Sequence, residues 1–214
     1  MKTILTLVLA ATLASAHAAP QESAPAGYAQ ARAQFFAGLG GDSGARNAAI
    51  EAFQTLAAGN PGHPLLSAYA GAAIALKARD AWMPWKKMEY AEKGANTIEK
   101  ALAQLTVAHD EQLFNGSPES VETRLVAANT LLALPDFMNR RAGGKHAIEA
   151  AMASPAFAGA GPVIRAGVLS AAAKVAAGEH RSADEITFLK QAVALAPQSQ
   201  YGAMAASRLK ELGQ

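Results

Sequence analysis

The chain repeats a pair of amphipathic segments about forty residues long, and this repetition limits the folds open to it. The second segment of a pair closes on alanine or leucine, and a proline follows five positions later, at Leu56–Pro61, Ala150–Pro155 and Ala192–Pro197. Because proline cannot continue a helix, it marks where each pair ends. This period is typical of a helical solenoid, in which each unit buries its apolar face against its neighbours.

The composition favours helices. Alanine, the best helix former, makes up about a quarter of the chain. β-Branched residues are sparse and no segment alternates at period two, so we expect no strands. Acidic and basic residues are interspersed with a formal net charge of +2, which indicates no nucleic-acid partner. With no cysteine, the chain has no disulfide.

Glycines, prolines and apolar stripes together predict about four helix pairs and a last helix. Pro135 and Gly143-Gly144 are expected to break the third pair, and His109–Ser117 to form a polar loop before it. The final helix has a polar outer face, as a terminal repeat requires. The expected helices are Ala24–Leu39, Ser43–Ala58, Pro64–Arg79, Pro84–Val107, one that follows the cap at Ser117 and has its stripe from Val121 to Leu132, Lys145–Ala153, Pro162–Ala177, Ser182–Ala196 and Gln198–Leu212.

Two segments resemble the tetratricopeptide repeat family. They are Ala177-Gly178-Glu179 followed by Leu189 and Ala192-Val193-Ala194-Leu195-Ala196-Pro197, and Ala48-Ala49-Ile50-Glu51-Ala52-Phe53 followed by Pro61. The resemblance implies that residues 19–214 form a single all-α domain, a right-handed α-α superhelix of about four helix pairs plus a C-terminal capping helix. It also implies that peptides bind on the concave surface, lined by the first helix of each pair.

Residues 1–18 have the layout of a secretory signal peptide. Lys2 supplies a positive charge, Ile4 to Ala14 is apolar, and small residues at Ala16 and Ala18 fit a cleavage site. The apolar run of about 11 residues is too short to span a hydrocarbon core of about 30 Å. We therefore expect an exported bacterial protein, periplasmic or secreted, with no stable membrane insertion after cleavage.

Both tryptophans lie three residues apart, in and just after the connection between the helices of the second pair. Tryptophan and arginine are enriched where protein partners are anchored, so this stretch is expected to bind a protein or peptide of the cell envelope. Two alternatives remain: both rings cover the core of the second pair, or the rings and lysines bind a membrane peripherally. The candidate residues are Arg79, Trp82, Trp85, Lys86 and Lys87.

Secondary candidates are polar residues on the first helices of the third and fourth pairs. They are Glu122, Arg124, Asn129 and Lys174. Any of them is equally interpreted as an ordinary surface residue.

No motif in the chain predicts catalysis. Gly41-Asp42-Ser43-Gly44 matches the nucleophile motif of trypsin-like serine proteases, but it lies between two helices, where a turn with a capping Asp or Ser explains it. His109-Asp110-Glu111 is expected to be a solvated helix end, because neighbouring residues on a helix point in different directions. We expect no cofactor and no metal.

The sequence therefore favours an exported scaffold for protein or peptide binding, without catalysis. The alternative is an α-helical ligand-binding or hydrolytic protein that acts on a cell-wall or small-molecule substrate. Acid–base chemistry would then need two carboxylates across a groove, roughly 5–10 Å apart in glycoside hydrolysis. The candidates are Asp80, Glu89, Glu92, Asp110 and Glu111.

Overall fold

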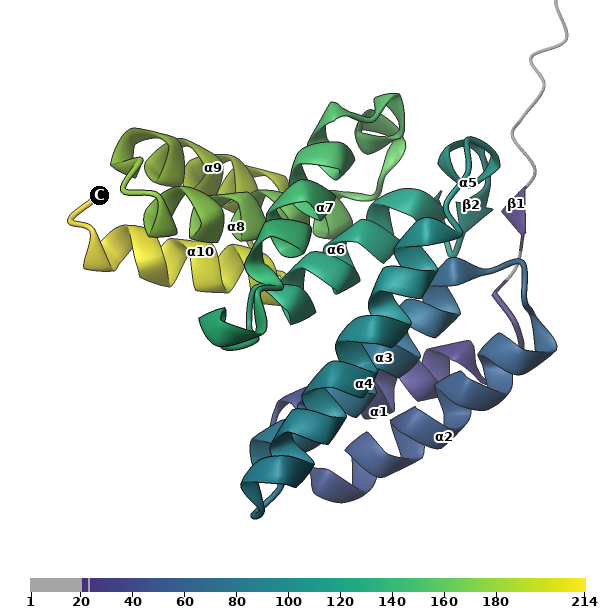
Figure 1. Ribbon diagram of the computed structural model, residues 1–214. Coiled ribbons are helices and arrows are strands. Elements are labelled where there is room, and N and C mark those ends of the chain that lie inside the picture. The colour runs from purple at the N-terminus through teal and green to yellow at the C-terminus, as the bar shows by residue number, and fades with distance from the viewer. Residues whose placement is uncertain (1–20, 23) are drawn as a thin grey trace, which may run out of the picture.

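The computed structural model describes residues 21–22 and 24–214, and most of this part is helical (Figure 1). The segment expected to be a signal peptide, 1–18, lies outside the described residues. The all-α class is confirmed. The helices are α1 (Tyr28–Leu39), α2 (Ser43–Gly59), α3 (Pro64–Asp80), α4 (Pro84–Ala103), α5 (Ala108–Glu111), α6 (Glu119–Leu131), α7 (Arg141–Ala153), α8 (Pro162–Gly178), α9 (Ser182–Leu195) and α10 (Gln200–Glu211), with 3-10 turns η1 (Asp136–Met138) and η2 (Pro155–Gly159).

Consecutive helices pack as hairpins. Helix α1 packs on α2, α3 on α4, α6 on α7 and α8 on α9, and α10 lies against α8 and α9 (Figure 1). Successive hairpins also touch, because α2 contacts α3, α3 and α4 contact α6, and α6 and α7 contact α8. Each hairpin therefore buries its apolar surface partly against its own partner helix and partly against the next hairpin.

Helix starts follow the expected chemistry. The carboxylate of Asp42 accepts a hydrogen bond of 2.9 Å from the backbone N–H of Ala45, which caps α2. This confirms the capping interpretation of the Gly41-Asp42-Ser43-Gly44 turn. Pro64, Pro84 and Pro162 occupy the first positions of α3, α4 and α8, where the missing N–H has no helical partner to lose.

The third hairpin differs from expectation. Helix α7 begins at Arg141 and runs through Gly143-Gly144, so the break predicted there is wrong. A Cβ on Gly144 would lie 2.8 Å from Cγ of Leu132, so this glycine lets α7 approach the end of α6. The chain does leave the helix before Pro135, and η1 follows it.

The segment expected to be a polar loop before α6 is folded. Helix α4 ends at Ala103, short of the predicted Val107, and α5 follows. Strands β2 (Leu113–Phe114) and β3 (Ser117–Pro118) form an antiparallel hairpin, and β1 (Gln21–Glu22) pairs with β2 in parallel. The expectation of no strands is therefore wrong here. Asn115 and Gly116 both have positive φ, as the tight turn of a two-residue hairpin requires.

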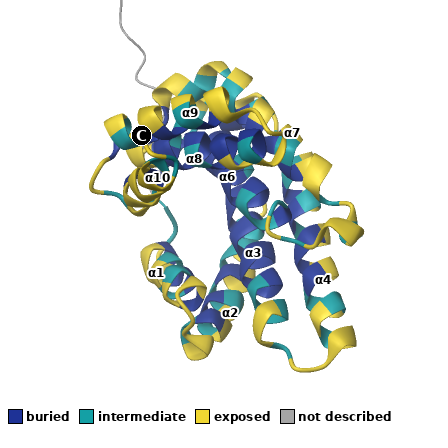
Figure 2. Cartoon of the chain, turned by 90° about the vertical axis from the view of Figure 1, so that its left-hand side faces the viewer, coloured by how far each residue is buried: buried dark blue, intermediate teal, exposed yellow. Residues whose placement is uncertain are grey.

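The first helices of the later hairpins are the most buried. Figure 2 shows α3, α6 and α8 almost entirely buried, whereas α2, α4 and α9 each keep an exposed side. Alanine dominates these interiors and lets the helices approach closely. An aromatic cluster lies in the core between the first two hairpins and the β2–β3 hairpin. The ring of Phe53 stacks on that of Tyr69 with 4.8 Å between ring centres, and Tyr28 meets Phe114 edge-on at 5.0 Å.

Candidate binding surface at the α3–α4 turn

The turn between α3 and α4 exposes the largest apolar side chains of the region. Trp82 is 89% exposed, Trp85 64% and Met83 40%. Trp82 lies in this turn and Trp85 on the first turn of α4, and the turn forms the free end of the α3–α4 hairpin (Figure 1). The alternative that both rings cover the core is therefore wrong. Rings this exposed add little to the packing of the core, and the two indoles with Met83 form an apolar patch at this turn.

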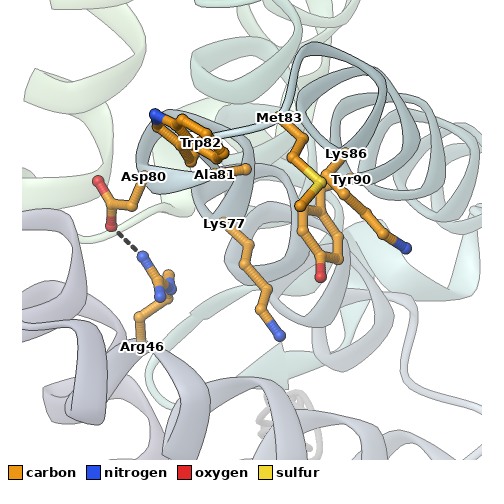
Figure 3. Close-up of a pocket in the computed structure, with 8 residues that line it drawn as sticks. All are labelled: Arg46, Lys77, Asp80, Ala81, Trp82, Met83, Lys86 and Tyr90. Carbon is orange, nitrogen blue, oxygen red and sulfur yellow. Dashed lines mark hydrogen bonds and ion pairs between the residues drawn. The ribbon is translucent and has the colours of Figure 1, made fainter.

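A hollow of about 320 Å³ lies beside this turn (Figure 3). Its described lining is mainly apolar and comes from α2, α3, the turn and the first part of α4. The volume is at the lower end of the roughly 300–1,000 Å³ range in which proteins enclose drug-sized ligands, and the hollow is open. Its lining residues are Arg46, Lys77, Asp80, Ala81, Trp82, Met83, Lys86 and Tyr90.

Ion pairs and hydrogen bonds fix the base of the turn. The carboxylate of Asp80 pairs with the guanidinium of Arg46, and it accepts a hydrogen bond of 3.1 Å from Nε of Arg79. The hydrogen bond from Arg79, with the charges of both guanidinium groups, lowers the pKa of Asp80. Arg79 also donates to the backbone oxygens of Gly38 and Leu39 at 3.0 and 2.9 Å. Arg79, a candidate for partner binding, therefore already serves to tie the α1–α2 turn to α3.

The lysines of the surface differ in how far they are neutralised. Nζ of Lys86 lies 2.7 Å from a carboxylate oxygen of Glu89, and this hydrogen bond raises the pKa of Lys86. Nζ of Lys77 lies 5.0 Å from the centre of the Tyr90 ring, a cation–π contact. Lys87 is exposed on the first turn of α4.

The secondary candidates are spread over α6 and α8 and do not join the tryptophans. Lys174 is exposed on α8, apart from the α3–α4 turn (Figure 1). Arg124 is half-buried with Nη1 3.4 Å from Asp110, and Asn129 is half-buried on the same helix. Glu122 is only 2% exposed, so its interpretation as a surface group is wrong.

Glu122 instead belongs to a buried polar cluster that the sequence analysis missed. Its Oε1 accepts a hydrogen bond of 2.7 Å from the Tyr69 hydroxyl and lies 3.5 Å from the Tyr28 hydroxyl. Nε of Arg32 lies 3.6 Å from the same oxygen and donates to Tyr69 at 3.2 Å. Burial raises the pKa of Glu122, and it also raises the pKa of both tyrosines. The cluster joins α1, α3 and α6.

Glu119 is the first residue of α6, one helical turn before Glu122. Its side chain is fully buried against the N-terminus of α3. Its Oε1 accepts a hydrogen bond of 3.0 Å from the N–H of Leu65, and its Oε2 lies 2.9 Å from Nδ1 of His63. A carboxylate is favoured at a helix N-terminus, where backbone N–H groups lack partners and the dipole is positive. Glu119 therefore caps α3 from another helix. The i, i+3 spacing of the two glutamates was the one available signal, and it is equally common on solvated helix faces.

The expected solvated helix end at His109 is also wrong for the histidine. His109 is buried, with Nδ1 3.0 Å from the N–H of Thr106 and Nε2 3.2 Å from the carbonyl oxygen of Gly62. Within residues 21–22 and 24–214, no three His, Cys, Asp or Glu side chains are placed to hold a metal ion. No helix in the same described part has the length and apolarity needed to cross a membrane.

Comparison with known proteins adds no assignment. No family model, no curated protein and no solved structure matches the chain.

Proposed function

We propose that this protein is an exported scaffold that binds a protein or peptide of the cell envelope and has no catalytic role. The observation that carries the proposal is the exposure of Trp82 and Trp85 at one rigidly tied turn, beside a hollow lined mainly by apolar atoms. Aromatic anchors next to a hollow are typical of protein-binding hot spots. The ion pair between Arg46 and Asp80 holds this turn in place before a partner arrives, which reduces the entropy lost on binding.

The architecture we propose is a right-handed α-α superhelix of the tetratricopeptide type, with α10 as its C-terminal cap. Its support is the order of the contacts, since each hairpin packs on the next one along the chain. The first helices α3, α6 and α8 are almost completely buried, so they do not offer the open concave peptide surface that the resemblance implies, and the binding surface we propose lies at the α3–α4 turn. Export is supported by the sequence of residues 1–18 and is tested by the mass of the processed protein, which should begin near Ala19.

The alternative, a hydrolytic or small-ligand protein, finds less support at this surface. Asp80 is the one carboxylate among the described residues that line the hollow, and its pKa is lowered. A general acid at neutral pH requires a raised pKa. Among the other candidate carboxylates, Glu89 pairs with Lys86, and Asp110 pairs with Ser120 and Arg124.

Photo-crosslinking in living bacterial cells tests the binding proposal. Benzoylphenylalanine replaces Trp82 in one variant and Trp85 in a second. Phe137 is the matched control position, because it is an aromatic residue, 68% exposed, on η1. We expect the same envelope protein to be captured from positions 82 and 85 and not from position 137. Capture from neither tryptophan position, or equal capture from all three, would overturn the proposal.

A further inference from the structure

The hollow beside Trp82 is lined by more positive than negative charge. Arg46, Lys77 and Lys86 line it, against the single carboxylate of Asp80. Asp80 is already engaged by Arg46 and Arg79, so its charge is offset within the protein. Arg46 is paired with Asp80 and Lys86 with Glu89, so the positive charge that a ligand of opposite charge would satisfy comes from Lys77.

Lys77 is the cation best placed to meet a ligand. Its ammonium group contacts the Tyr90 ring and has no carboxylate partner in the described part of the chain. Figure 3 shows its side chain extending between Arg46 and Tyr90. The aromatic contact restricts the lysine without using its three N–H donors, so these remain available to an acceptor.

The apolar part of the lining suits one large side chain. Trp82, Met83, Ala81 and Tyr90 contribute it, and the hollow is open to solvent at the tip of the hairpin. Apolar walls next to cations indicate a ligand with an apolar anchor and neighbouring negative charges.

We propose that the partner is an acidic peptide segment. It places one large aliphatic or aromatic side chain in the hollow, and an adjacent Asp or Glu carboxylate faces Lys77. This inference rests on the proposed binding function and names the chemistry of its partner. An anionic membrane is less favoured at this site. A hollow of this size takes a single side chain, and a lipid surface offers no such discrete anchor.

Selection from a phage-displayed library of random short peptides tests the proposal on the purified protein. We expect the selected peptides to combine a large apolar residue with neighbouring Asp or Glu. Their binding should be lost in Trp82→Ala, should weaken about fivefold in Lys77→Gln, and should weaken with added salt. Lys100→Gln is the matched control, because Lys100 is an exposed lysine near the other end of α4, and it should bind as wild type does.

The outcomes separate the two proposals. Peptides that depend on Trp82 but lack acidic residues, or that ignore Lys77→Gln, would overturn the acidic partner and leave the binding function standing. Selection of no peptide that depends on Trp82 would overturn both. Flotation with vesicles of phosphatidylglycerol and phosphatidylethanolamine, abolished by Trp82→Ala, would overturn the peptide in favour of a lipid surface. Circular dichroism and unfolding midpoints confirm that each variant is folded.

Discussion

Helices α3 and α4 approach closely where Gly71 faces Gly94, and this contact predicts the effect of Gly94→Ala. A Cβ on Gly94 would lie 2.6 Å from the carbonyl oxygen of Gly71, and 2.7 Å from both N and Cβ of Ala75. Real Cβ atoms essentially never come this close to other heavy atoms. Two of the three neighbours are backbone atoms and the third is a Cβ, so no side chain can rotate away. The two helices must separate to admit one methyl group.

The expected sign opposes intrinsic helix propensity. Replacing a helical glycine with alanine stabilises an isolated helix by about 1 kcal/mol. Overpacking a core costs about 1–3 kcal/mol, and more where the backbone must move. Since α3 and α4 must shift against each other, we take the cost from the upper end of that range. The free energy of unfolding of Gly94→Ala should fall by about 2 kcal/mol, which lowers Tm by roughly 4–8 °C for a domain of this size.

Urea unfolding followed by circular dichroism measures the difference, and Gly143→Ala is the matched control. Gly143 is an exposed glycine in α7, and a Cβ there would lie at an ordinary 3.5 Å from Cδ1 of Leu131. This control should be as stable as wild type, or up to about 1 kcal/mol more stable. If Gly94→Ala matched or exceeded the stability of wild type, the inferred close contact of α3 and α4 would be refuted.

Three further predictions concern the buried carboxylates and the exposed tryptophans. Burial raises the pKa of the Glu122 carboxyl above its usual 4.5. Between pH 4.5 and the folded-state pKa, Glu122 is therefore protonated in the folded protein but ionised in the unfolded chain. The free energy of unfolding of wild type falls as pH rises through this window. Glu122→Gln cannot ionise, so its stability relative to wild type should increase over that window and stay constant below it; parallel stability curves from pH 4 to 8 would contradict this. Glu119→Ala removes the buried carboxylate that accepts from the Leu65 N–H, so the free energy of unfolding should fall by about 3 kcal/mol in urea titration. A loss under about 1 kcal/mol would argue against the cap. The fluorescence of Trp82 and Trp85 should be red-shifted and quenched by acrylamide, whereas blue-shifted, unquenched emission would show that the rings are covered.

Local signals in the sequence predicted most of the helices. The predicted starts at Ser43, Pro64, Pro84, Pro162 and Ser182 are confirmed to the residue. Caps and first-turn prolines act through the backbone of their own helix, so neighbouring residues suffice to recognise them. The helix ends are less accurate, because the last turn of α4 is replaced by a turn into α5.

The errors occur where a distant element decides the outcome. Gly143 and Gly144 looked like breakers, yet α7 runs through them because the end of α6 needs a residue without a side chain at Gly144. The strands β2 and β3 were missed because two residues are too few for a period-two pattern.

The sequence predicted where the candidate surface lies, but it did not decide whether the two tryptophan rings are buried or exposed. Trp82 and Trp85, three residues apart in and just after the α3–α4 connection, identified the place, because such residues are rare in this alanine-rich chain. Whether the rings faced the core or solvent depended on the path of α4 after Pro84, and that path is set by its packing on α3. The hollow beside them includes Arg46 from α2, which no local pattern could assign to it.

The sequence by itself determined the all-α class, the starts of most long helices and the location of the aromatic turn, since propensity, capping and breaking act over a few neighbouring residues. Only the tertiary structure decided that Glu119 and Glu122 are buried, that Tyr28, Tyr69 and Arg32 surround the second of them, and that both tryptophans face water. The physical reason is that burial and charge pairing are properties of side chains brought together from different helices. The sequence around a glutamate does not show whether water or tyrosine hydroxyls will hydrogen-bond to its carboxylate.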